Sequence, residues 1–383
     1  MKFSDITGHK EIVDSLRALV DSGKIPHAFL FSGVSGIGKH RTARALAQYI
    51  HCKNRSNGDA CGVCSSCLQH QNHNNPDLHF IYPIVKKDGA LISKDFIEEW
   101  REMLDNHSYM PPEQWNQLLN AGNSQTTILV AESDEIVARA SLSSFQEDFK
   151  IFLIWLPEKL RTEAANKLLK IIEEPFEDTI FILVSNNENK ILPTILSRTQ
   201  RFNFKPLSEE DLQSLLLKNG VEASLAREAA RISAGSLRKA DEIASHPEEM
   251  LEFSDLFKDL MRAAYGLKAK KLKELADEIA GFGREKIIRF LDYMARMIRE
   301  NYIFNFQLPP VSYMTQEEST FSSRFAPFIH DGNVEAISEE IGRGARDIER
   351  NGNSKIVLFD MFLILSRLIR KPRVMCLPGL EEI

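Results

Sequence analysis

The segment of residues 150–204 places the strongest constraint on the fold. It contains two continuous apolar runs, at residues 151–155 and 179–184. Runs of this length without polar alternation are typical of strands that are buried on both faces of a parallel sheet. Between them, residues 160–174 carry apolar side chains at helical spacing, and Pro175 ends the run. The sequence therefore predicts a strand–helix–strand unit of a nucleotide-binding α/β domain.

A glycine-rich loop follows another predicted strand, at residues 27–32. Residues 33–40 match the phosphate-binding pattern G-x-x-x-x-G-K-[ST] except at the last position. The glycines allow a tight turn with N–H groups facing phosphate, and the next helix points its N-terminus at the same place. Imidazole is a poor substitute for the hydroxyl that normally binds Mg²⁺ at that last position. The candidate nucleotide site consists of Gly33, Gly36, Gly38, Lys39 and His40.

Several motifs, in the same order, resemble the clamp-loader branch of the AAA+ ATPases. Residues 166–175 are similar to its N-x-L-L-K…E-E-P helix, and residues 192–198 to its arginine-finger segment. The cysteine that usually follows the arginine is Thr199 here. The resemblance covers roughly residues 1–245. It implies an arginine finger at Arg198, which acts in trans on ATP held by a neighbouring subunit.

The other half of an ATPase site is missing from the sequence. In this family the core strand before the helix ends in two carboxylates, one for Mg²⁺ and one for the attacking water. Those positions are Trp155 and Leu156 here, and Glu158 lies beyond the predicted strand. An indole and an isobutyl group neither bind a metal nor polarise water. Together with His40, these residues predict a chain that does not hydrolyse ATP, while binding of ATP or ADP stays open.

Four of the five cysteines lie between residues 52 and 67. Their spacing brings four thiolates to one point, which suits a closed tetrahedral Zn²⁺ site, whereas the further cysteine and proline of an iron–sulfur motif are absent. The predicted ligands are Cys52, Cys61, Cys64 and Cys67. The delta-prime and gamma/tau subunits of the family carry a similar zinc module here. Three nearby histidines are interpreted as surface residues rather than ligands: His70, His73 and His79.

The remaining segments complete a predicted α/β P-loop AAA+ core with helical additions. Residues 83–149 form a mostly helical insertion, for which a partner surface and a passive cap are equally supported. Ser208 is placed to cap the first helix of a three-helix lid. In that lid Gly235-Ser236-Leu237-Arg238 resembles the sensor-2 motif, so Arg238 is expected to face nucleotide phosphate. The predicted domains are an ATPase-like domain at 1–205, the lid at 206–246 and a helical collar at 247–383.

Composition narrows the class of protein. A length of 383 residues indicates two or three domains, and 43% hydrophobic with 27% charged residues is ordinary for a globular protein. The net charge of −6 argues against a surface that binds nucleic acid everywhere. The first residues contain no apolar signal region, and no run approaches the ~18 apolar residues of a membrane span. We therefore expect a cytoplasmic protein without a membrane partner.

Three functions compete at this point. The first is an ATPase-dead clamp-loader subunit with gamma/tau and delta subunits as partners, which acts on a sliding clamp and primed DNA through the complex. The second is a self-contained AAA+ ATPase, which would hydrolyse ATP alone and lose that activity on Lys39→Ala. The third is a zinc-dependent nucleic-acid adaptor, which would bind DNA by itself in a salt-dependent way.

Overall fold

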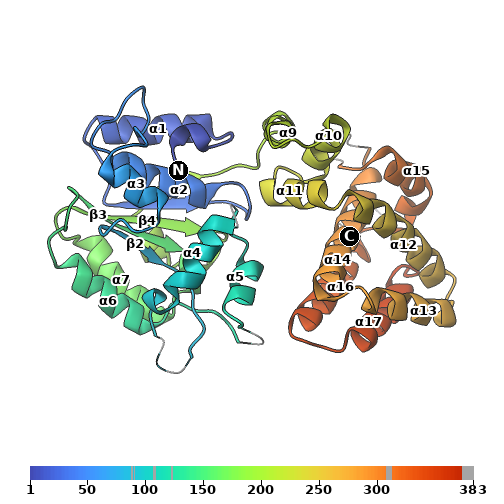
Figure 1. Cartoon of the computed structure of the whole chain (residues 1–383). Coiled ribbons are helices and arrows are strands. Elements are labelled where there is room, and N and C mark those ends of the chain that lie inside the picture. Colours follow the sequence, from blue (N-terminus) through green and yellow to red (C-terminus); the bar gives the residue numbers. More distant parts are fainter. Residues whose placement is uncertain (88, 90, 107–108, 122–123, 308–312, 373–383) are drawn as a thin grey trace, which may run out of the picture. The chain divides into compact units, whose positions relative to one another are not determined.

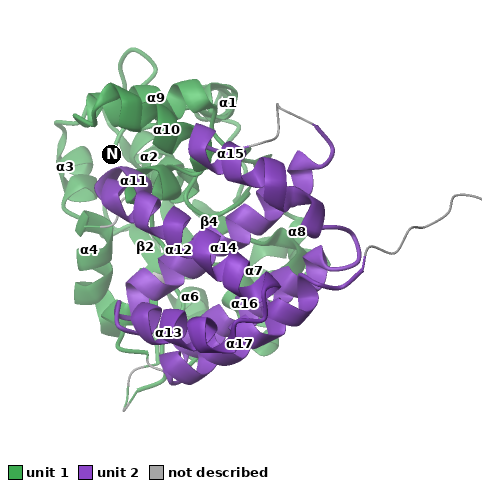
Figure 2. Cartoon of the chain, turned by 90° about the vertical axis from the view of Figure 1, so that its right-hand side faces the viewer, with its two compact units in different colours: residues 1–242 green, residues 243–383 purple. Residues whose placement is uncertain are grey.

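The computed structural model describes residues 1–372 except 88, 90, 107–108, 122–123 and 308–312 (Figure 1). The chain forms two compact units, residues 1–242 and 243–383, which are coloured separately in Figure 2. The first unit contains all strands found in the described residues, and the second contains helices. The finer division of the first unit into an ATPase-like domain and a lid stays a prediction.

The first unit is built on a five-stranded parallel sheet with the order β2-β3-β4-β1-β5. Its strands are β1 Ala28–Ser32, β2 Leu78–Ile81, β3 Lys150–Trp155, β4 Thr179–Ser185 and β5 Gln200–Asn203. All residues of β1, β3 and β4 are buried, which explains why these segments are continuous apolar runs. The strands predicted at 27–32, 151–155, 179–184 and 201–204 are confirmed to within one residue at each end.

Helices cover both faces of this sheet (Figure 1). Phe29 and Phe31 of β1 pack into one core with α1 and α2, whereas Leu30 packs into the opposite core with α6 and α7. This division follows from the alternation of side chains along a strand. The four helices are α1 Lys10–Asp21, α2 Lys39–His51, α6 Val130–Ala140 and α7 Thr162–Glu173.

The insertion lies between β2 and β3, as predicted, and is mainly helical in its described residues. It contains α4 Ile97–Asn106, α5 Pro112–Leu118 and α6. The spacing of Phe96, Trp100 and Leu104 correctly predicted α4, whose buried side chains join the core beneath α2. Another short helix, α3 Ser65–Gln71, follows the cysteine-rich segment.

Three helices follow β5, as expected for the lid. They are α9 Glu209–Lys218, α10 Ala223–Ile232 and α11 Leu237–Ser245. The predicted cap is confirmed, because the Ser208 hydroxyl accepts a hydrogen bond from the Asp211 N–H at 3.1 Å. The helices α9 and α10 pack against each other through Leu212, Leu216 and Ala226, which are all buried.

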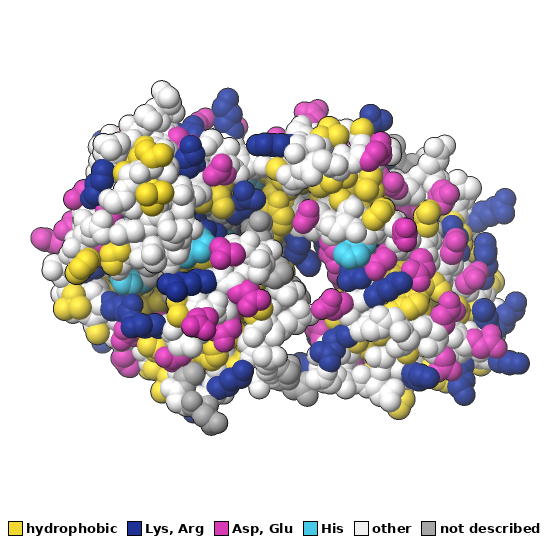
Figure 3. Space-filling model, viewed as in Figure 1, with side chains coloured by type: hydrophobic (Ala, Val, Ile, Leu, Met, Phe, Trp, Pro, Cys, Tyr) yellow, Lys and Arg dark blue, Asp and Glu magenta, His cyan; other side chains and the backbone are white. Residues whose placement is uncertain are grey.

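The second unit has its own apolar core. Its main helices are α12 Pro247–Tyr265, α13 Ala269–Ala280, α14 Arg284–Phe304, α15 Gln316–Phe325, α16 Val334–Glu349 and α17 Ser354–Leu368. In α17, Leu358, Phe362 and Leu365 are buried in this core, so the apolar stripe predicted there serves the unit itself. On the face shown in Figure 3, basic and acidic side chains are interspersed over the surface.

Candidate functional site

The glycine-rich loop connects β1 to the N-terminus of α2, where a phosphate-binding loop is expected. Gly33, Gly36 and Gly38 have φ values of +146°, +79° and +93°, which side chains with a Cβ rarely adopt. Gly36 is needed for a second reason, because a Cβ there would lie 2.8 Å from Ser236 Oγ. The sequence therefore identified a loop whose backbone does require glycine.

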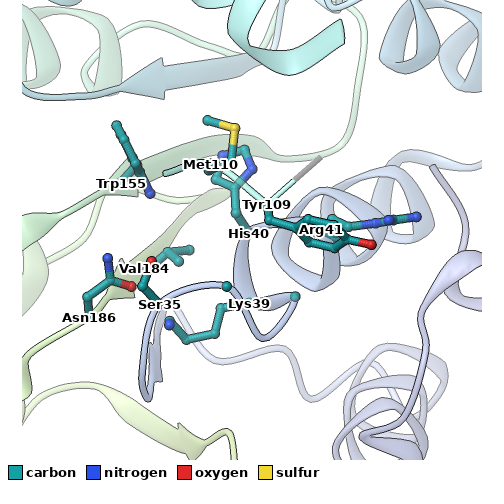
Figure 4. A pocket seen from close by; sticks show the side chains of 11 residues that line it. Ser35, Lys39, His40, Arg41, Tyr109, Met110, Trp155, Val184 and Asn186 are labelled. Carbon is teal, nitrogen blue, oxygen red and sulfur yellow. The ribbon is translucent and has the colours of Figure 1, made fainter. Parts of the chain in front are cut away.

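Lys39 is folded back onto its own loop (Figure 4). Its ammonium group donates hydrogen bonds to the carbonyl oxygens of Gly33, at 2.7 Å, and Val34. Burial lowers the pKa of Lys39 to about 8, an effect that the nearby Glu158 carboxylate partly opposes. Glu158 is held in turn by the Asn186 N–H, which donates to its carboxylate at 2.9 Å. The ammonium group that was predicted to face phosphate is thus hydrogen-bonded within the protein.

The lid closes directly on the same loop. The Arg238 N–H donates to the Gly36 carbonyl oxygen at 3.3 Å, and a Cβ on Gly36 would lie 2.8 Å from the Arg238 Cβ. The Arg238 guanidinium lies 3.9 Å from the Glu242 carboxylate, so this ion pair is at the limit of contact. Arg238 therefore contacts the loop through its backbone N–H, and the prediction that its guanidinium faces nucleotide phosphate stays a prediction.

The pocket that remains beside the loop is very small. The cavity has a volume of about 20 Å³, and its lining includes Lys39, His40, Trp155 and Asn186. One water needs roughly 10–15 Å³, and pockets for organic ligands reach about 300–1,000 Å³. In this conformation the enclosed cavity beside the loop has the size of about one water.

His40 faces an aromatic cluster where a metal-binding residue would be needed. Its ring lies 5.7 Å from that of Trp100, edge to face, and neither ring nitrogen has a hydrogen-bond partner. Complete burial holds the pKa of His40 well below its ordinary value, so the ring is neutral. A neutral imidazole surrounded by indole provides no site for Mg²⁺.

The chain's three tryptophans meet in this cluster. The ring of Trp100 lies 5.5 Å from that of Trp155, 5.3 Å from that of Trp115 and 4.0 Å from that of Tyr82, on which it stacks. Trp155 occupies the end of β3, where the family carries a carboxylate, and Trp100 comes from the insertion. The insertion thus packs an indole against the position where the resemblance predicted a metal-binding carboxylate. We predicted no such role for the insertion from the sequence, although the presence of only three tryptophans in 383 residues was a usable signal.

The turn after β3 carries the second position at which the resemblance predicted a carboxylate. Leu156 is buried and adopts a left-handed conformation, with φ of +56°. Glu158 follows in a short 3₁₀ turn and is half-buried beside Asn186. The two positions expected to carry carboxylates therefore hold buried apolar side chains.

The four cysteines converge as the spacing predicted. Their Sγ atoms all lie within 4.8 Å of one another. Backbone N–H groups are aimed at the sulfurs, with Cys61 N 3.2 Å from Cys52 Sγ and Cys64 N 3.4 Å from Cys61 Sγ. Such donors, from Val63 and Cys64, lower the pKa of the Cys61 thiol to about 6. Four convergent sulfurs with N–H donors form a closed donor set that fits one tetrahedral metal ion.

The interpretation of the three histidines as surface residues was wrong. His70 is buried and its Nε2 lies 2.9 Å from Nδ1 of His51, which is itself held by the Phe149 carbonyl. The His73 side chain is largely buried between Arg44 and Asp105. His79 is half-buried, with Nδ1 3.2 Å from the Arg139 guanidinium. These contacts come from distant elements, which is why local sequence did not reveal them.

Arg198 lies in a different setting, after the short helix α8 Pro193–Leu196 and two residues before β5. Its side chain is 38% exposed and pairs at 2.8 Å with Glu173, at the end of α7. The guanidinium also donates to the Thr194 carbonyl at 2.9 Å and to Ser197 Oγ at 3.1 Å. Arg198 therefore takes part in a local ion pair, and its side chain also remains partly accessible to solvent.

Comparison with known proteins agrees with these motifs. The family described as "DNA polymerase III, delta subunit" matches residues 8–208, just over half of the 383 residues. The chain belongs to this family. DNA polymerase III subunit tau of Escherichia coli is 31% identical over 244 residues, or 62% of this chain and 32% of that protein. Subunit gamma/tau of Mycobacterium tuberculosis is 29% identical over 216 residues, or 56% of this chain and 31% of that protein.

This member of the DNA polymerase III delta-subunit family thus spans about a third of the length of those two curated relatives. A DNA polymerase III gamma subunit-related protein from Thermotoga maritima matches in structure with a TM-score of 0.40 and 13% identity, over 94% of this chain and 99% of that one. Family membership confirms the resemblance drawn from the motifs. Among the described residues, no helix is both long and apolar enough to cross a membrane.

Proposed function

We propose that this chain is a delta-prime-like subunit of a DNA polymerase III clamp loader that does not hydrolyse ATP itself. The observation that carries the proposal is the contrast between Lys39, whose buried ammonium bonds to its own loop, and Arg198, whose side chain stays 38% exposed beside Glu173. Its partners would be gamma/tau and delta subunits in the cytoplasm. The assembled complex would act on the sliding clamp and primed DNA.

The proposed chemistry is an arginine finger supplied in trans. Arg198 would lie against the γ-phosphate of ATP bound by a neighbouring subunit, where a guanidinium stabilises the charge of the transferring phosphoryl group. Such fingers contribute ~10³-fold or more to kcat. Its planar fork suits this task better than the point charge of a lysine.

Reconstitution with gamma/tau and delta subunits tests this proposal. Arg198→Ala should leave assembly intact, lower the clamp- and DNA-stimulated ATPase rate in part, and cripple clamp loading, since only the adjoining ATPase site loses the finger. Arg198→Lys should rescue poorly. Arg231→Ala, at an exposed lid position, is the matched control. An Arg198→Ala complex that loads clamps at the unmodified rate would contradict the finger role.

ATP hydrolysis by the purified chain is the second test. The closed loop, Trp155 and Leu156 predict none above background. Turnover by the chain alone that disappears on Lys39→Ala would instead support the self-contained ATPase.

We further propose that the four cysteines hold one structural Zn²⁺. The support is their convergence within 4.8 Å, with no position left open for catalysis. Metal analysis should find one zinc per chain, and Cys67→Ser should lose it together with stability, because binding energy at such sites is folding energy. A visible charge-transfer band from bound iron would overturn this assignment.

A further inference from the structure

Two large apolar side chains are exposed on the loop that precedes β3. Leu142 is 66% exposed and Phe145 is 85% exposed. Scattered apolar residues on a surface are normal, and exposure alone gives them no role. The feature that sets this loop apart is how firmly the chain holds it.

Asp77, just before β2, fixes the backbone of the loop. Its carboxylate accepts hydrogen bonds from the N–H groups of Phe145 at 2.7 Å, Gln146 at 2.7 Å and Glu147 at 2.8 Å. The ammonium of Lys150 adds bonds to the carbonyls of Ala140 and Leu142. A phenyl group presented by a preformed loop loses little conformational entropy when it binds, which is the property of an interface anchor.

The loop lies at the amino edge of the sheet, where the parallel strands begin (Figure 1). Phe176, 41% exposed, precedes β4 at the same edge. Arg198 precedes β5 there as well. Three strand spacings separate β3 from β5, or ~15 Å. A protein interface of standard size covers roughly 800 Å² on each partner, so one neighbour can contact the whole row.

The charge of this edge indicates the chemistry of that neighbour. Exposed carboxylates accompany the apolar side chains, at Asp148, Glu174, Glu177 and Asp178. Nucleic acid would meet repulsion between these groups and its phosphates. A protein surface with lysine or arginine around an apolar pocket would be attracted, and its on-rate would fall with salt.

We propose that the amino edge of the sheet is a docking surface for the neighbouring subunit that receives Arg198. Leu142, Phe145 and Phe176 anchor it in an apolar pocket, and the carboxylates pair with basic residues around that pocket. The identity of this neighbour rests on the proposed finger function. In this proposal the apolar side chains provide the affinity for the neighbouring subunit, and Arg198 raises the rate of ATP hydrolysis in that subunit.

Pairwise titration of the full chain with the gamma/tau subunit tests the anchors. Phe145→Ser and Leu142→Ser should each weaken binding about tenfold, the size expected of interface anchors. Leu217→Ser is the matched control, since Leu217 is 44% exposed on the lid and should change nothing. Because the anchors are exposed, all three variants should melt at the unmodified temperature. Affinities of the anchor variants equal to that of the control overturn the proposal.

Two further arms identify the partner. Replacing the four carboxylates by amides should weaken binding and flatten its salt dependence; unchanged salt dependence contradicts the basic pocket. If Phe145→Ser instead weakens binding of primed DNA by the chain alone, the surface serves nucleic acid and the proposal fails.

Arg198→Ala should slow ATP hydrolysis by the complex and leave the pairwise affinity for gamma/tau unchanged. If Arg198→Ala leaves hydrolysis unchanged while Phe145→Ser weakens binding, the docking surface is supported and the finger role of Arg198 is wrong.

Discussion

The two edges of one parallel sheet differ in how fully internal contacts occupy their side chains. At the carboxyl edge, Lys39 bonds to its own loop, the lid backbone touches Gly36, and Trp155 and Leu156 are buried where the resemblance predicted carboxylates. At the amino edge, Phe145 is exposed on a loop that Asp77 holds, and Arg198 is 38% exposed beside Glu173. The carboxyl edge, here called the closed edge, is filled by internal contacts. The amino edge, here called the open edge, presents exposed side chains on segments with a fixed backbone.

On the proposed finger function, this difference is what a fold that keeps one half of a shared site would have. A site built from two subunits needs phosphate binding on one side and a finger on the other. A chain that supplies only the finger is free to fill its own pocket, and filling it adds packing to the core. We therefore expect substitutions at the closed edge to lower the free energy of unfolding, and substitutions at the open edge to change binding or catalysis in the complex.

The largest expected effect is at the closed edge. Trp100→Ala would remove a fully buried indole that packs on Trp155, Trp115 and Tyr82. Losses of this kind cost about 3–5 kcal/mol, and Trp100 Nε1 has no hydrogen-bond partner whose loss would add to that. Phe145→Ala, the control at the open edge, should change stability by less than about 0.5 kcal/mol. Equal losses in chemical denaturation would remove the contrast between the edges.

The sequence was a good guide to what is encoded locally. Continuous apolar runs located β1, β3 and β4, and the cysteine spacing located the convergent sulfurs. It was a poor guide to what depends on remote partners. The contact of Gly36 with Arg238 joins residues about 200 positions apart, and Trp100 reaches His40 only because α4 folds back under α2. No local periodicity contains that information.

A second prediction concerns the charge buried at the closed edge. The pKa of Lys39 is lowered to about 8 in the folded chain, whereas an unfolded lysine titrates near 10.5. Between these values unfolding takes up a proton, so stability rises with pH. The unfolding free energy of the unmodified chain minus that of Lys39→Met should therefore increase from pH 8 to 10.5, by on the order of 3 kcal/mol.

The same subtraction for Arg198→Met provides the control at the open edge. This substitution removes no lysine, tyrosine or cysteine, the side chains whose ordinary pKa values lie near this range, so the difference should be flat. Urea titrations at closely spaced pH values measure both differences, and the other titrating groups cancel in each. A flat result for Lys39→Met would mean that its ammonium is not desolvated and that the closed edge is more open than described.

The smallest expected effect is at the open edge itself. Glu173 lies 2.8 Å from the Arg198 guanidinium, and both side chains are 38% exposed. Exposed ion pairs contribute about 0.2–1 kcal/mol, so Glu173→Gln should barely change the unfolding free energy. If Glu173 orients the finger, the same substitution should lower kcat of the reconstituted complex by up to about fivefold, with KM unchanged.

The other end of the same helix offers a control for that substitution. Glu163→Gln removes an exposed carboxylate from the first turn of α7 and should leave kcat unchanged. The effect should also depend on the finger, so Glu173→Gln added to Arg198→Ala should cause no further loss, as coupled residues show in a double-mutant cycle. A rise in kcat on Glu173→Gln would reverse the assignment, because Glu173 would then restrain Arg198 rather than aim it. Independent losses would show that Glu173 acts on the complex by another route.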